Sequence, residues 1–388
     1  MTIVLKNIQK AFKGREVLKD LNLEVANGDF HVLLGPSGSG KTTVLSIMAG
    51  LMKQDHGQVF IGRKDVSRLS PADRGVGFVF QDYALFPHLT VFENIAYGLR
   101  VRKLEQGRIE ARVEDYLRRV NLQKEKEKLP NQLSGGQKQR VAVARALVQD
   151  PQILLMDEPM SSLDPLTKER IGCELKAMQE ETGMTTIYVT HNQEEAHLLG
   201  NTVSILNHGR IEQAERAENL FDHPKTEFVA RFLGANNILK VSVTMLEAQE
   251  AIMHVHHEKM KRPFPMRVRR YPIFEKRKEM ELCIHPGKIF LKKRNHAVHD
   301  GVNRIEGTIT HITAKLHVVN VTIDVGGLVL HAAVSRELFS FHLHEKIWAC
   351  FHLDAPHPLC GRSCREAEPL RKCVNRPALS IFGHAYEC

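Results

Sequence analysis

The sequence LLGPSGSGKTTVLSIMAG, residues 33–50, places a glycine-rich loop between two apolar runs. The loop has few large apolar side chains that could pack in a core, and a second apolar run begins after it at Val44. This pattern predicts a strand, a loop and a helix in succession. Glycines let successive backbone N–H groups point at phosphate oxygens, with a helix N-terminus behind them. We therefore expect a phosphate-binding loop.

This loop fits the pattern G-x-x-x-x-G-K-[ST] in full, from Gly35 to Thr42. In that pattern Lys41 reaches the β- and γ-phosphates of a nucleotide, and the hydroxyl of Thr42 binds Mg²⁺. A glycine-rich turn that happens to contain lysine is the alternative, but the strand before the loop and the helix after it favour nucleotide binding. The predicted nucleotide-binding residues here are Gly35, Pro36, Ser37, Gly38, Ser39, Gly40, Lys41, Thr42 and Thr43.

Two carboxylates end the apolar run ILLMDE, residues 153–158. Asp157 closes a predicted strand, where it could hold the Mg²⁺ shell. Glu158 points elsewhere and could orient or deprotonate an attacking water molecule. An ordinary acidic strand end would look the same by itself, but the phosphate-binding loop makes the catalytic interpretation the better one.

The run LSGGQKQRVAVARAL, residues 133–147, predicts a second anion site. Ser134, Gly135 and Gly136 open a helix, so that backbone N–H groups can approach a phosphate closely. One nucleotide has one γ-phosphate, which the first loop already holds. A second phosphate-binding loop about 100 residues later makes most sense if it serves a nucleotide on another subunit.

The remaining pattern is that of an α/β protein. Residues 1–30 alternate apolar and polar side chains, as antiparallel strands do, and residues 92–128 are helical and charged in character. The apolar runs 152–158 and 184–191 flank a helical segment. Apolar strands that alternate with helices indicate a largely parallel sheet, covered on both faces.

With these motifs in this order, residues 1–235 resemble the nucleotide-binding subunit of an ATP-binding cassette (ABC) transporter. The family's other motifs are matched by Gln81 in FVFQDYALFPHLTVFENI, by SSLD at 161–164, and by His191 in VTHNQEEA. The resemblance implies a P-loop core with antiparallel and helical subdomains. It also implies two copies that hold two ATP molecules head to tail, residues 133–137 of one copy facing the loop of the other.

Roles for single residues follow from the same resemblance. It implies that Glu158 is the catalytic base, that His191 contacts the γ-phosphate, and that Gln81 senses Mg²⁺ and leads into the surface that docks a membrane subunit. Phe12 stands where the family stacks an aromatic ring on adenine, although it could simply pack. The second half of the ATP site is implied to comprise Ser134, Gly135, Gly136, Gln137 and Asp164.

Two positions depart from the family pattern. Asn192 follows His191 where an aspartate is usual, and Met160 precedes SSLD where an aromatic residue is common. Neither departure removes a group from the chemistry, so we expect them to affect only rates.

The pattern of apolar and polar residues changes after FVARFLGANNIL, residues 228–239. Short alternating segments predict a small all-β domain over residues 236–355, followed by an irregular cysteine-rich tail over residues 356–388. The β-domain resembles the oligonucleotide-binding-like TOBE domain of importer ATPases, with His285 in an arginine position. FLGANNIL and LHAAVSRELF most resemble the molybdate or tungstate importers; sulfate, ferric iron, polyamine and sugar importers share the architecture.

Composition sets further limits on this chain of 388 residues. No apolar run approaches the roughly 18 residues of a membrane helix, and the N-terminus has no signal-peptide design, so we expect a cytosolic chain whose membrane role comes through a partner.

The net charge of +9 is concentrated at residues 257–280, which read as a solvated basic face or as a site for nucleic acid or lipid headgroups. Late cysteines such as Cys360, Cys364 and Cys373 match no paired zinc design, which favours a reduced tail over a metal site.

These observations predict an ATPase with ATP and Mg²⁺ as cofactors. It would dimerise on ATP and energise a permease at the cytoplasmic face of the cell membrane, and serve a solute-binding protein indirectly. The solute would be small, with molybdate, tungstate or another oxyanion as the first expectation and ferric iron, a polyamine or a sugar as alternatives. The rival classes are a soluble ABC ATPase that acts on DNA or ribosomes and an exporter ATPase; we expect no nucleic-acid partner.

Overall fold

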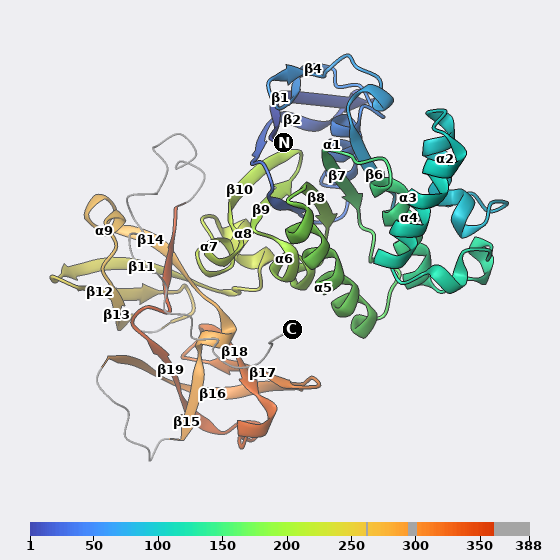
Figure 1. Ribbon diagram of the computed structural model, residues 1–388. Helices are drawn as coiled ribbons and strands as arrows, with labels where there is room; N and C mark the ends of the chain where they lie inside the picture. Colours follow the sequence, from blue (N-terminus) through green and yellow to red (C-terminus); the bar gives the residue numbers. More distant parts are fainter. Residues whose placement is uncertain (261–262, 294–300, 361–388) are drawn as a thin grey trace. The chain divides into compact units, whose positions relative to one another are not determined.

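The computed structural model describes residues 1–260, 263–293 and 301–360, and the chain divides into two compact units (Figure 1). The first unit ends at Leu220 and the second begins at Phe221. The first unit contains β1 (Ile3–Phe12), β2 (Arg15–Val25), β3 (Phe30–Leu34), α1 (Lys41–Ala49), β4 (His56–Ile61), β5 (Lys64–Asp65), β6 (Val76–Val79), α2 (Val91–Val101), α3 (Gln106–Arg119), α4 (Gly135–Leu147), β7 (Ile153–Asp157), α5 (Pro165–Thr182), β8 (Thr185–Thr190), α6 (Gln193–Leu199), β9 (Thr202–Asn207) and β10 (Arg210–Arg216).

A sheet of order β10-β9-β3-β8-β7-β6 forms the centre of the first unit. Its strands from β9 to β6 pair in parallel, and β3, β7 and β8 are buried at every residue. Parallel strands buried on both faces tend to be continuously apolar, as the segment Ile153–Met156 of β7 is. In register, Leu34 lies opposite Thr190 and Asp157 lies opposite Val189. The carboxyl ends of β3, β7 and β8 therefore meet at one edge of the sheet.

A second, antiparallel sheet has the order β2-β1-β4-β5. It confirms the antiparallel strands expected over residues 1–30. Its inward side chains, such as Leu5 and Val59, share one core with Val44 and Leu45 of α1 and with Leu33 of β3. Helix α1 is thus held between the two sheets, which places its N-terminus at the end of β3.

The helices α2, α3 and α4 lie beside one another (Figure 1) and surround a core of their own, which includes Ile95, Val113 and Val141. A capping box at Thr90 begins α2. The stretch expected to be helical over residues 92–128 is thus two helices, with a break after Val101 and a 3₁₀ turn at Gln123–Glu125.

The second unit is almost entirely β-structure. Helix α7 (Ala217–Asp222) crosses the division between the units. The elements that follow it are α8 (Glu227–Phe232), β11 (Asn237–Leu246), β12 (Glu250–His256), β13 (Phe264–Arg269), α9 (Ile273–Lys276), β14 (Glu279–Ile284), β15 (Phe290–Lys293), β16 (Val302–Ala314), β17 (Val318–Asp324), β18 (Val329–Ser335), β19 (Lys346–His352) and β20 (His357–Leu359).

Two antiparallel sheets, of order β13-β12-β11-β14-β20 and β15-β19-β16-β17-β18, bury their apolar faces in one shared core. This finding agrees with the all-β region expected in the last third of the chain. The buried side chain of Asn237 links the sheets, because its amide donates to the carbonyls of Ile284 and His331 and accepts the N–H of His331. A fully satisfied polar bridge of this kind sets how the two sheets align.

The expectation of an irregular tail from residue 356 was wrong for its first residues. His357–Leu359 form β20, which pairs with β14, and Cys360 is buried. Leu359 packs with Cys283 and with Ala230 of α8, and these apolar contacts stabilise the added strand. Cys364, Cys373 and Cys388 lie outside the described residues. The boundary predicted after residue 235 stays a prediction.

A single histidine, His31 of β3, makes the first unit sensitive to acid. Its ring is buried, and Nδ1 lies 2.7 Å from Oγ1 of Thr202. Burial lowers the pKa of His31 from 6.5 to about 4. The unfolded chain therefore binds this proton below pH 6.5, whereas the folded chain binds it only near pH 4, so stability is lost as the pH falls through that window.

We expect His31 to reduce the free energy of unfolding by roughly 3 kcal/mol between pH 7 and pH 4. Urea unfolding followed by circular dichroism should show a flatter pH dependence for His31→Gln than for the wild type. The exposed His208 offers a control: His208→Asn should keep the wild-type slope. Equal slopes for wild type and His31→Gln would contradict the assignment.

Candidate functional site

The loop between β3 and α1 has a backbone that requires glycine. At Gly35 a Cβ atom would collide with the carbonyl oxygen of Leu206, and at Gly40 it would lie 2.8 Å from Cδ2 of Leu18. Gly40 also has a φ of 107°, a left-handed conformation, and it caps α1 without a side-chain hydrogen bond. The N–H groups at the start of α1 are therefore left for a ligand, as a phosphate-binding loop requires.

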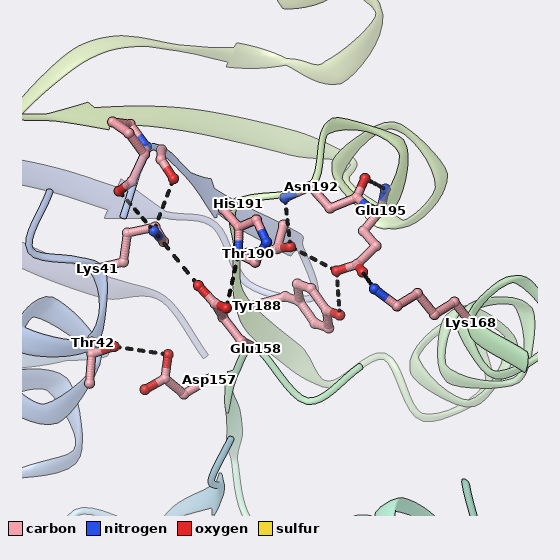
Figure 2. A network of polar contacts seen from close by, with 12 residues as sticks. Lys41, Thr42, Asp157, Glu158, Lys168, Tyr188, Thr190, His191, Asn192 and Glu195 are labelled. Atoms are coloured by element: carbon pink, nitrogen blue, oxygen red, sulfur yellow. Dashed lines mark hydrogen bonds and ion pairs between the residues drawn. The ribbon is translucent and has the colours of Figure 1, made fainter. Parts of the chain in front are cut away.

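Lys41 is the first residue of α1, and its side chain reaches back to the loop (Figure 2). Its Nζ donates to the carbonyl oxygens of Gly35 at 2.9 Å and Pro36 at 3.1 Å, and it is 3.8 Å from Oε1 of Glu158. Burial lowers the pKa of Lys41, while the carboxylates of Glu158 and Asp157 raise it. The ammonium group is thus held by two neutral carbonyl oxygens, which the charged oxygen of a phosphate can replace.

Thr42 and Asp157 offer oxygen atoms that fit Mg²⁺. Oγ1 of Thr42 donates to Oδ1 of Asp157 over 3.2 Å. Neighbouring ligands of an octahedral Mg²⁺ lie about 3 Å apart, and hydroxyl and carboxylate oxygens are the ligands this ion takes. Burial raises the pKa of Asp157, against the hydrogen bond of Thr42, so an unpaired carboxylate is disfavoured here and a cation beside it is favoured.

Glu158 lies one residue further along in a different orientation. Its φ is 43°, and its backbone N–H donates to the carbonyl of Val189 at 3.0 Å. Left-handed backbone at a residue with a Cβ persists only where the surroundings hold it, and such positions concentrate at functional sites. Oε2 of Glu158 is 2.9 Å from Nδ1 of His191. The structure thus brings Lys41, Thr42, Asp157, Glu158 and His191 together, and we call these five residues the Lys41 cluster.

A buried network that the sequence pattern did not reveal lies beside His191. Tyr188 and Thr190 both donate to Oε2 of Glu195, at 3.0 Å and 2.7 Å, while Nζ of Lys168 lies 3.2 Å from Oε1 (Figure 2). Glu195 is 6% exposed, and these three donors satisfy its charge. The available signal was the pair of hydroxyl groups on Tyr188 and Thr190, which lie two residues apart and therefore on the same face of β8.

The departure at Asn192 has a structural role. Its side chain accepts the N–H groups of Glu194 and Glu195 and so caps α6. Asparagine caps helices about as well as aspartate does, so the helix that follows His191 begins at the same residue with either side chain.

The residues from the second glycine loop form a separate pocket of about 230 Å³, which we call the Ser134 pocket. Ser134 and Gln137 satisfy each other's backbone N–H groups in a capping box at the start of α4, and Asp164 caps α5. None of the lining residues belongs to the Lys41 cluster; they are Ser134, Gly135, Gly136, Gln137, Arg140, Ser162, Leu163, Asp164, Thr167 and Arg170.

Three further residues named in the sequence analysis differ in their exposure to solvent. Gln81 is exposed just beyond β6, and Phe12 is exposed at the end of β1 with its ring 5.5 Å from Nζ of Lys10. Met160 is fully buried, so this departure contributes to packing.

Comparison with known proteins identifies the family. A sequence profile described as "ABC transporter" matches residues 18–161. A spermidine/putrescine import ATP-binding protein of Photobacterium profundum is 46% identical over 251 residues, which are 65% of this chain and 68% of that relative. The chain belongs to the import ATP-binding subunits of ABC transporters. It is an ATPase coupled to transport, and ATP with Mg²⁺ is the family's standard nucleotide.

Other similar proteins agree with this assignment. A sulfate/thiosulfate import ATP-binding protein of Xanthomonas campestris is 50% identical over 241 residues, or 61% of this chain and 70% of that relative. Among solved structures, the ATP-binding cassette MJ0796, a dimer bound to ADP and Pi in a post-hydrolysis state, is 37% identical with a TM-score of 0.51. That likeness covers 55% of this chain and 98% of the solved one. In the described residues, no helix is long and apolar enough to span a bilayer.

Because the backbone of Gly35 lies close to the carbonyl oxygen of Leu206, we expect one added methyl group at residue 35 to disturb nucleotide binding strongly. Gly35→Ala should displace the loop, lower the melting temperature and weaken nucleotide binding at least tenfold, measured by titration with a fluorescent ATP analogue. Gly107 in α3 has open space around its Cβ position and is the matched control. Gly107→Ala should raise helix stability by about 0.5–1 kcal/mol and leave nucleotide binding unchanged. Wild-type affinity in Gly35→Ala would show that the loop does not hold the nucleotide.

Proposed function

We propose that two copies of this chain hold two ATP molecules head to tail and hydrolyse them to drive import of a solute through a membrane permease. One observation carries this proposal: the Lys41 cluster and the Ser134 pocket share no lining residue within a copy. A nucleotide held by Lys41 of one copy would gain the N–H groups of the Ser134 pocket from its partner. The solved dimeric cassette supports such pairing.

The proposed catalytic roles follow from the contacts in the Lys41 cluster. Glu158 acts as general base, because its left-handed backbone separates its carboxylate from Asp157 and its Oε2 contacts His191. That contact uses Nδ1 of His191 and leaves Nε2 for the γ-phosphate. Lys41, Ser134 and the loop N–H groups stabilise the charge that develops on the phosphate oxygens during in-line attack of water.

The remaining assignments concern the nucleotide and the metal. Thr42 and Asp157 would hold Mg²⁺, with Gln81 as a further ligand, and the bound ion would neutralise phosphate charge. Phe12 would stack on adenine, and Gln137 and Asp164 would complete the half-site offered to the partner copy. These roles place the chain at the cytoplasmic face of the membrane, bound to permease subunits and, through them, to a solute-binding protein.

A mixture of two inactive variants tests the head-to-tail arrangement. Glu158→Gln should bind ATP and dimerise yet turn over very slowly, and Ser134→Arg should block the pocket it lines. A mixed dimer would keep one intact site, with the base from one copy and Ser134 from the other. When the two are mixed before ATP is added, ATPase activity should rise to about a quarter of wild type, since half of the dimers are mixed and each has one working site.

A variant outside the proposed ATP site serves as the control for the mixing experiment. Glu194→Gln, an exposed glutamate on α6, should keep the wild-type rate. Absence of any gain on mixing would contradict a site shared between copies. Wild-type turnover by Glu158→Gln alone would show that another residue is the base.

We propose an oxyanion as the solute, with the second unit acting as a TOBE-type regulatory domain that binds it. The sulfate/thiosulfate relative supports the class of solute, and residues 221–360 hold 20 lysines and arginines against 14 aspartates and glutamates. A positive field attracts oxyanions and repels polyamine cations. Molybdate and tungstate are members of this class. A polyamine is the second candidate, because the spermidine/putrescine relatives are similarly close.

Thermal unfolding in the presence of each solute separates these candidates. Molybdate, tungstate or sulfate at 1 mM should raise the melting temperature of the second unit, whose Trp348 reports its unfolding by fluorescence, and spermidine should not. A shift with spermidine alone would favour the polyamine importer. No shift with any oxyanion would count against regulation by oxyanion binding and leave the ATPase assignment untouched.

A further inference from the structure

The loop between β6 and α2 has an unusual backbone at two consecutive residues. Tyr83 and Ala84 have φ angles of 63° and 44°, and neither is glycine. Left-handed backbone is unfavourable for residues that carry a Cβ atom. Two such residues in a row persist only where neighbouring groups hold them.

Arg145 of α4 is the group that holds this backbone. Its Nη1 donates to the carbonyl of Ala84 at 2.7 Å, and its Nη2 donates to the carbonyl of Tyr83 at 2.9 Å. The guanidinium group also lies 5.5 Å from the ring centre of Phe86. A planar fork is needed to reach two successive carbonyls at once, and lysine has no such fork.

The side chain of Tyr83 connects the same loop to the segment after Glu158. Tyr83 is 6% exposed, and its hydroxyl lies 2.9 Å from Oγ of Ser162. Ser162 lies in a turn in which the N–H of Leu163 donates to the carbonyl of Met160 at 3.2 Å, and we call this the Ser162 turn. It overlaps a turn closed on Glu158, because the N–H of Ser161 donates to the carbonyl of Glu158 at 3.2 Å. Tyr83 therefore links the loop that Arg145 holds to the turn that follows Glu158, the proposed base.

The two ends of this link line two different cavities. A groove of about 750 Å³ is lined by Arg145 and Ala84 together with Phe86 and Tyr97. Ser162 lines the Ser134 pocket. The contacts from Arg145 through Tyr83 to Ser162 thus run from one cavity to the other within a single unit.

We propose that Tyr83 is a positioning residue that couples the groove to the Ser162 turn, and so sets the position of Glu158 for hydrolysis. Arg145 lines the groove and holds the left-handed loop, and the hydrogen bond between the hydroxyl groups of Tyr83 and Ser162 fixes the turn relative to that loop. The inference rests on the proposed role of Glu158. It goes beyond that role, because Tyr83 and Arg145 make no contact with the nucleotide in this scheme.

Removing the hydroxyl alone tests the link. Tyr83→Phe and Ser162→Ala should each lower kcat about fivefold, the factor that corresponds to one neutral hydrogen bond. For Tyr83→Phe the Kd for ATP, measured in the Glu158→Gln background so that hydrolysis does not interfere, should stay unchanged. The double variant should be no slower than either single one, since both remove the same bond.

Three matched variants separate positioning from a merely structural role. Tyr97→Phe removes an exposed hydroxyl from the same groove and should keep the wild-type kcat. Ser162→Thr retains the hydroxyl and should keep most of the rate. Arg145→Lys should lower kcat in the wild-type background but have no further effect in Tyr83→Phe, where the link is already cut.

Several outcomes would overturn the proposal. They are a wild-type kcat in Tyr83→Phe, a double variant slowed by the product of the two single effects, or an Arg145→Lys effect of equal size in both backgrounds. A fall in melting temperature that accounts for the lost rate would also overturn it. Inactivity of Glu158→Gln is independent of all of these results, so failure of the link and failure of the catalytic assignment can be told apart.

Discussion

The parallel register of β3, β7 and β8 is the constraint on which the site depends. Because Leu34 pairs with Thr190 and Asp157 pairs with Val189, three strands end at the same level. Residues as distant in sequence as Lys41 and His191 therefore meet at one sheet edge. The buried strands supply the rigidity, and a polar group at a strand end, such as Asp157, finds polar partners there that the apolar interior of the sheet would not offer.

Charge balance explains why this edge suits a nucleotide with a metal ion. Lys41 and Asp157 are both 5% exposed, and Glu158 is close to them, so two carboxylates share one ammonium group. Burial raises the pKa of Asp157 and lowers that of Lys41, so the charged form of each is disfavoured by desolvation. A divalent cation beside Asp157 and phosphate oxygens beside Lys41 would stabilise these charged forms.

The second half of the site is built on helix starts. Ser134 and Asp164 each accept a backbone N–H at the beginning of a long helix, and the two lie around one pocket. These side chains fix the loops locally, while the link from Tyr83 to Ser162 ties the same pocket to the groove beside α2. The cassette thus has stable local structure at each motif and a small number of polar contacts between motifs.

Local sequence determined the parts whose physics is local. The glycine-rich run, the apolar runs of buried strands and the Ser134-Gly135-Gly136 turn identified the phosphate loop, Asp157, Glu158 and the start of α4. They also identified the all-β character of the second unit, although not β20, because a three-residue strand has too little pattern to detect. Only tertiary structure decided what depends on long-range contact: the pairing of Glu158 with His191, the burial of Glu195 among three donors, and the clamp on Tyr83. These contacts join residues from different strands and helices, so no spacing along the chain can reveal them.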